Sequence, residues 1–187
     1  MNSIDCSMKA ESLKLLKTIK GKTLVGYLSA DEHMKNDILF NLVLLFADGS
    51  SIVACVDHVP SKMYGEDGVI SRLDCIEDVL DKYHTYHRFK VNNLAIDDIE
   101  IITDVAEVSD SETADNYSIS VGSGIMLKGA ESNFVIALNF DYSDDDWLRV
   151  SSSNSIDELR PIEDVKDSWG DGEDGVAVVV HRTSRSI

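Results

Sequence analysis

Residues 38–56, ILFNLVLLFADGSSIVACV, constrain the fold more than any other part of the chain. Two runs rich in branched and aromatic apolar residues flank Asp48-Gly49, a pair typical of the type I′ turn of a β-hairpin. The first run is apolar at nearly every position, as expected of a central strand that is covered on both faces. This stretch therefore predicts a hairpin whose first strand lies inside a sheet.

Several other stretches predict strands. Residues 22–30 and 97–108 are predicted to be strands, the latter with one face exposed to solvent, and residues 176–182 are predicted to be a buried or semi-buried closing strand. Residues 117–153 repeat the order of residues 22–57: a strand, a link, an apolar strand, a turn and a return strand. The two segments predict a weak internal repeat of hairpin units.

Helical spacing of apolar residues predicts two main helices. They cover residues 5–20 and 72–88, and Ser71 is a candidate N-cap for the second. Residues 57–70 between them contain proline and glycines and are predicted to form a loop. The predicted fold class is α+β, in which a largely antiparallel, twisted sheet of about seven or eight strands packs with both helices. Residues 1–187 are predicted to form a single domain.

Residues 141–175 are predicted to be acidic and rich in loops. They contain 12 acidic and 3 basic residues, a net charge of −9. Ser155 and Glu158 fit a capping box at the start of a very short helix that ends before Pro161. The segment then continues through three glycines to the closing strand.

The charge of the chain is strongly asymmetric. The formal net charge is −17, but residues 1–22 carry five lysines and two acidic residues, so the remainder carries −20. A body this negative repels phosphate backbones, which excludes a nucleic-acid partner. It attracts basic surfaces and accelerates encounter with them.

The sharpest candidate site is the cluster of three aspartates before Trp147. In a strand over residues 147–151, Leu148 and Val150 would face the core, which leaves Trp147 on the wetter side beside carboxylates. An indole in that place suits contact with lysine or arginine. We therefore expect a partner-binding site made of Asp144, Asp145, Asp146, Trp147, Trp169, Asp171, Glu173 and Asp174.

A metal site is the alternative. On a helix over residues 72–88, Glu77, Asp81 and His84 would share one side and His87 would lie close by. The other interpretation of this pattern is a solvated helix face with ion pairs, which we prefer. The acidic loops fail the EF-hand pattern, and the three glycines of residues 122–129 fit neither nucleotide-binding fingerprint. No catalytic motif is present, and no cofactor is expected.

The leading hypothesis is a non-enzymatic, acidic protein-binding module that docks on a basic partner. In size, acidity and predicted architecture the chain resembles the small acidic immunity proteins of bacterial toxin systems, although it shares no motif with them. That resemblance implies an inhibitor of a bacterial toxin or nuclease. Mimicry of nucleic-acid charge is a related hypothesis, and a metal-dependent enzyme or metal-binding protein is the alternative. A homodimer formed through apolar strands is a further hypothesis.

The expected compartment is the cytoplasm. Three cysteines without CxxC spacing favour a reducing environment over a disulfide framework. The longest apolar run is about half of a bilayer span, so no membrane contact is expected.

Overall fold

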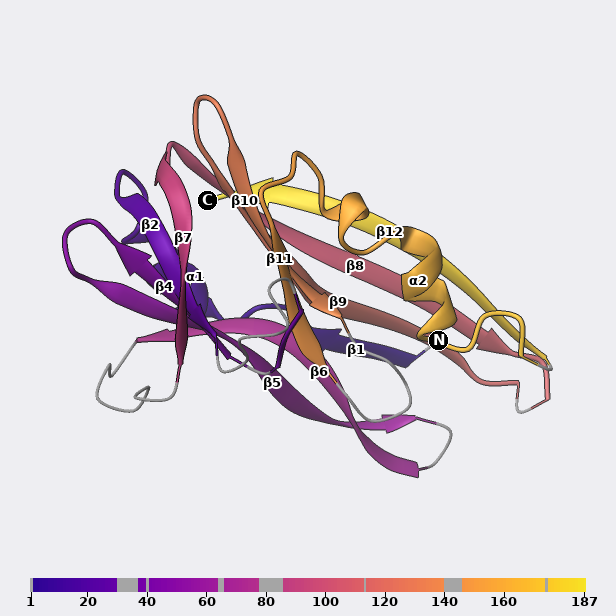
Figure 1. Ribbon diagram of the computed structural model, residues 1–187. Helices are drawn as coiled ribbons and strands as arrows, with labels where there is room; N and C mark the ends of the chain where they lie inside the picture. Colours follow the sequence, from indigo (N-terminus) through magenta and orange to yellow (C-terminus); the bar gives the residue numbers. More distant parts are fainter. Residues whose placement is uncertain are drawn as a thin grey trace.

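The computed structural model shows two β-sheets that face each other across a shared core (Figure 1). It describes residues 2–29, 37–39, 41–63, 66–77, 86–112, 114–139, 146–173 and 175–187. Within these ranges, no helix has the length and apolar content needed to cross a bilayer.

Seven strands form the larger sheet, which we call the large sheet. Its order is β12-β8-β9-β10-β11-β3, and β1 pairs with β9 outside this path. All pairs are antiparallel except β1 with β9. The strands are β1 (Asn2–Cys6), β3 (Asp37–Leu39), β8 (Asp98–Asp110), β9 (Asn116–Lys128), β10 (Asn133–Asn139), β11 (Trp147–Ser151) and β12 (Val176–Ser186).

Five strands form the small sheet, in the order β6-β5-β4-β2-β7, and all of its pairs are antiparallel. The strands are β2 (Thr23–Ser29), β4 (Asn41–Phe46), β5 (Ser51–Met63), β6 (Glu66–Glu77) and β7 (His87–Ala95). β3 leaves this run of strands and pairs with β11, so the chain crosses to the large sheet between β2 and β4.

The predicted hairpin over residues 38–56 is confirmed as β4 and β5. Leu42 and Leu44 lie in the main core, whereas Val43 lies in a second cluster on the outer face of the small sheet. The turn is not type I′, because Gly49 has a positive φ of +83° and Asp48 does not. The N–H of Gly49 donates to the carbonyl of Phe46, as in a longer hairpin loop that closes with a left-handed glycine.

The helix prediction over residues 72–88 is wrong in its described part. Residues 72–77 belong to β6, and residues 87–88 begin β7. Residues 57–70 are not a loop in their described part, since they continue β5 and begin β6. The apolar residues of this region fit both the spacing of a helix and the alternation of a strand. Cross-strand pairing makes the region a strand.

The helices of the structure are short. α1 (Ala10–Lys17) lies inside the predicted helix of residues 5–20, but the first residues of that range complete β1. η2 (Ile156–Glu158) confirms the predicted short helix, with the Ser155 side chain accepting from the N–H of Asp157. α2 (Ile162–Asp167) replaces part of the predicted acidic loop.

The fold is therefore mostly β rather than a balanced α+β fold. The largely antiparallel arrangement is confirmed, but the strands form two sheets instead of one. Both segments of the predicted repeat contain three neighbouring antiparallel strands, β2-β4-β5 and β9-β10-β11, but β3 interrupts the first set along the chain. The closing strand runs to Ser186, beyond the predicted residue 182.

Candidate functional site

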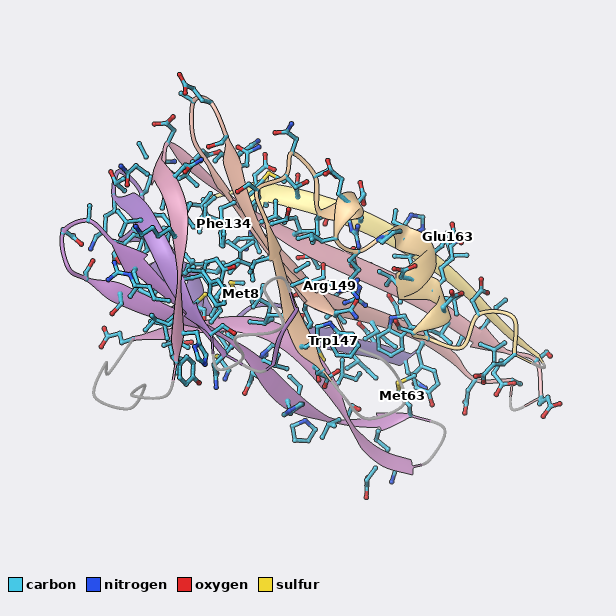
Figure 2. All side chains as sticks on the ribbon, in the orientation of Figure 1. Met8, Met63, Phe134, Trp147, Arg149 and Glu163 are labelled. Carbon is cyan, nitrogen blue, oxygen red and sulfur yellow. The ribbon has the colours of Figure 1, made fainter. Side chains whose placement is uncertain are left out.

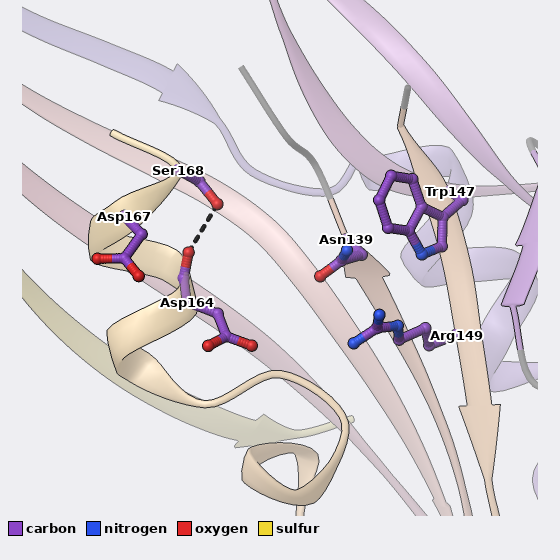
Figure 3. Close-up of a pocket in the computed structure, with 6 residues that line it drawn as sticks. All are labelled: Asn139, Trp147, Arg149, Asp164, Asp167 and Ser168. Carbon is purple, nitrogen blue, oxygen red and sulfur yellow. Dashed lines mark hydrogen bonds between the residues drawn. The ribbon is translucent and has the colours of Figure 1, made fainter. Parts of the chain in front are cut away.

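A hollow of about 250 Å³ lies between α2 and the strands β10 and β11 (Figure 3). Its two walls carry opposite charges, a guanidinium on one and two carboxylates on the other. Asn139, Trp147 and Arg149 form the sheet wall, and Asp164, Asp167 and Ser168 form the helix wall. We call this hollow the α2 pocket.

The sheet wall follows from strand alternation. Leu148 and Val150 are buried in the core, so Trp147 and Arg149 point to the opposite face of β11, as predicted for Trp147. The Arg149 guanidinium carbon lies 5.9 Å from the centre of the Trp147 ring, within cation–π range. Asn139 is the direct cross-strand partner of Trp147. Figure 3 shows the three side chains on the neighbouring strands β10 and β11, and Figure 2 places Trp147 and Arg149 within the whole molecule.

The indole nitrogen of Trp147 is a buried donor without an acceptor. Among the residues that the structure describes, no atom accepts a hydrogen bond from Nε1. Leaving a buried donor unsatisfied costs roughly 1–3 kcal/mol. Figure 3 shows this nitrogen on the side of the ring that faces Asn139 and Arg149.

The helix wall consists of exposed carboxylates. α2 follows Pro161, buries Val165 in the main core and carries Asp164 and Asp167 on the outside. In the described ranges neither aspartate forms an ion pair with a lysine or arginine, and Lys166 on the same helix pairs with Glu163 at 3.0 Å. The Ser168 hydroxyl donates to the Asp164 carbonyl at 2.7 Å and closes the helix.

A buried ionic network anchors the chain between β11 and α2. Arg182 on β12 donates to both carboxylate oxygens of Asp104, at 2.7 and 2.9 Å, and also to the carbonyl of Arg160. Arg160 is fully buried and donates to the carbonyl of Leu138. Burial lowers the pKa of Arg160 to about 10, while the charge of Asp104 opposes this shift. The network ties the segment that leads into α2 to the large sheet.

Exposed carboxylates surround the α2 pocket on one side. Between Asp157 and Glu173 there are seven acidic residues and two basic ones, and one of these, Arg160, is buried. The acidic turn between β8 and β9 lies close by, because the N–H of Ser111 donates to the carbonyl of Gly175. We call this region the acidic end. Lys20 instead pairs with Asp98, at the opposite end of β8.

The predicted partner-binding residues have different roles in the structure. Trp147 lines the α2 pocket, but Asp146 is held by the Ser71 hydroxyl. Trp169 packs against the main core, and Asp171 accepts a hydrogen bond from the N–H of Val178 at 3.0 Å. Glu173 is exposed at the acidic end. Asp144, Asp145 and Asp174 lie outside the described residues.

Ser71, His58 and Asp146 form a cluster that resembles a catalytic triad only in composition. The Ser71 hydroxyl contacts the Asp146 carboxylate and lies 3.0 Å from Nδ1 of His58. The same Nδ1 lies 3.7 Å from the Asp146 carboxylate. A triad needs the serine and the carboxylate on different ring nitrogens, so this cluster lacks that geometry. It joins β11 to the β5–β6 hairpin.

The helix that was predicted to carry the alternative metal site is not present in the described residues. Glu77 ends β6 and His87 begins β7, while Asp81 and His84 lie outside the described residues. In the described ranges no group of three or more His, Cys, Asp or Glu side chains could hold a metal ion. The three cysteines are free and buried.

Five of the six pocket residues were not indicated by the sequence. Asp164 and Asp167 are three positions apart and would share a helix face, but Pro161 and the following glycines favoured a loop. Arg149 shares the face of Trp147 by strand alternation, whereas Asn139 joins the pocket only through strand register, which has no local signal.

No family model, curated protein or solved structure matches the chain significantly. Its function is therefore inferred from the geometry of the site.

Proposed function

We propose that the protein is a non-enzymatic, acidic protein-binding module, and that its α2 pocket receives a lysine or arginine side chain from a basic partner. One observation carries the proposal. Asp164 and Asp167 face Trp147 and Arg149 across the pocket, and among the described residues neither aspartate forms an ion pair with a lysine or arginine.

The two walls suit different parts of a basic residue. The partner's cation would lie between the carboxylates of the helix wall, with its apolar stem against the indole. Recognition would thus require a cation at the end of an apolar stem, which a lysine or arginine side chain of a basic peptide supplies.

The acidic end supports the approach of such a partner. Its carboxylates come from α2, from the residues before β12 and from the β8–β9 turn, so their fields add on one side. Complementary fields raise association rates and make them sensitive to salt. An inhibitor that covers the basic active site of a nuclease or another toxin is one instance of this class.

Charge removal within the pocket should weaken binding of a basic peptide. The probe is an acetylated, amidated peptide of six alternating lysine and glycine residues, titrated by isothermal calorimetry at low salt. In the Asp164→Asn/Asp167→Asn variant we expect the dissociation constant to rise about tenfold, equivalent to roughly 1.4 kcal/mol. Neutral amides keep the size of the side chains but lose the charge.

The matched control is Asp97→Asn/Glu131→Gln, which removes two exposed charges outside the acidic end. It should change the dissociation constant less than about twofold, because these charges lie far from the pocket. Equal weakening by both variants would reduce the interaction to general charge attraction and overturn the proposed site. Absence of binding by the unmodified protein would overturn the proposed function.

A further inference from the structure

β12 is an edge strand of unusual length and regularity. It pairs with β8 over eleven consecutive positions without a register shift, and it ends the strand order of the large sheet. Long regular edge strands are templates for pairing with another chain. In Figure 1 the far side of β12 carries no neighbouring strand.

Hydrogen bonds at both ends of β12 determine which of its backbone N–H and C=O groups point away from the sheet. The N–H of Ser111 donates to the Gly175 carbonyl, and the N–H of Ile187 donates to the Ile99 carbonyl. The backbone N–H and C=O groups of the odd-numbered residues of β12 therefore form the hydrogen bonds to β8. The N–H and C=O groups of the even-numbered residues point away from the sheet.

The first two outward N–H groups are satisfied. Val176 donates to the Glu173 carbonyl, and Val178 donates to the Asp171 carboxylate at 3.0 Å. In the part of the chain that the structure describes, no acceptor is found for the outward N–H groups of Val180, Arg182, Ser184 and Ser186. Four donors in alternation therefore form an open edge.

The two edges of the small sheet are protected. The Ser12 hydroxyl of α1 accepts from the N–H of Cys75 and donates to its carbonyl, which covers part of the β6 edge. β7 carries Arg88 and Lys90 and has a register shift against β2. Bulges and basic residues discourage edge pairing. β12 carries Arg182, which is paired with Asp104, and Arg185, but it has no bulge, and its Val179 side chain is 50% exposed.

We propose that a second copy of this chain pairs with β12 in an antiparallel arrangement centred on Thr183. In this register Val180 pairs with Ser186 of the second copy and Arg182 pairs with Ser184, so all four open N–H groups of each copy find acceptors. Exposed Val179 then lies opposite Ile187 of the second copy.

Charge complementarity supports a second copy as the occupant. The antiparallel pairing brings Asp171 and Glu173 of one copy toward the C-terminal end of β12 in the other. That end carries Arg185, and Lys20 lies beside it, donating to the Ile187 carbonyl at 3.2 Å. α2 packs against the large sheet from one face, so pairing along the edge leaves the α2 pocket open.

Sedimentation velocity of the full chain tests the proposal. At about 100 µM the unmodified protein should sediment as a dimer, with twice the 20.7 kDa mass of one chain. Ser184→Pro removes one outward donor from each copy and places a ring on the edge, while the bonds of its odd-numbered neighbours to β8 remain. We expect its dimer dissociation constant to rise at least about tenfold. Ser184→Ala keeps the N–H and should remain dimeric.

A second variant tests the proposal if Ser184→Pro does not fold. Val179→Lys alters only an exposed side chain, and it places a charge opposite Ile187 of the second copy, so it should also shift the protein toward the monomer. Amide exchange gives an independent readout, because the four open N–H groups should become protected as concentration rises. A monomeric unmodified protein, or dimers of unchanged stability in both Ser184→Pro and Val179→Lys, would overturn the proposal.

Discussion

Replacing Asp104 with alanine should lower the free energy of unfolding by about 3–5 kcal/mol, because it leaves buried cations without their carboxylate. Asp104 is 3% exposed and accepts two hydrogen bonds from Arg182. Burial alone would lower the pKa of Arg182, but the hydrogen bonds to Asp104 raise it above its ordinary value. Without Asp104, Arg160 and Arg182 would repel each other inside the protein. Urea denaturation measures the loss.

Asp157→Ala is the matched control, since it also removes a carboxylate that contacts Arg182. Asp157 is largely exposed, so its pair with Arg182 is screened by water, and its loss should cost less than about 1 kcal/mol. If the two variants lose equal stability, the buried pair does not anchor the segment before α2.

Gly26→Ala should lower the free energy of unfolding by about 2–3 kcal/mol, because a methyl group has no room at this position. A Cβ atom on Gly26 would lie 2.4 Å from the carbonyl oxygen of Phe89 on β7. That oxygen belongs to the backbone, so relief requires β7 to move away from β2. The movement would also disturb the stacking of Tyr27 on Phe89, whose ring centres are 5.0 Å apart. Thermal and urea unfolding report the change.

Gly68→Ala is the control for Gly26→Ala. Gly68 lies on β6, where a Cβ atom meets nothing within 4 Å and φ is not positive. Alanine there should change stability by less than about 0.5 kcal/mol. Similar losses in the two variants would mean that the close approach of β7 to β2 is not needed for the fold.

The features predicted correctly are those that local chemistry determines. The β4–β5 hairpin follows from two apolar runs around Asp48-Gly49, and the burial of Leu148 and Val150 follows from strand alternation. The short helix after Ser155 follows from its cap. Each of these depends on residues within a few positions of one another.

The errors arise where distant partners decide the outcome. Leu73 and Ile76 fit a helical stripe, but pairing with β5 makes their segment a strand, with Leu73 buried and Ile76 exposed. The α2 pocket likewise depends on the pairing of Asn139 with Trp147 and on the packing of Val165 beneath α2. No single stretch of sequence carries that information, so the acidic loop was predicted and the helix wall was not.

The most direct test of the central claim is the NMR signal of the indole N–H groups. The chain has two tryptophans, so Trp169 serves as an internal reference for Trp147. On titration with the lysine–glycine peptide, the Trp147 Nε1–H resonance should shift in a saturable manner and the Trp169 resonance should stay in place. In Asp164→Asn/Asp167→Asn the Trp147 shift should be largely lost. A Trp147 resonance that does not move, or that moves no more than Trp169, would contradict a binding site at the α2 pocket.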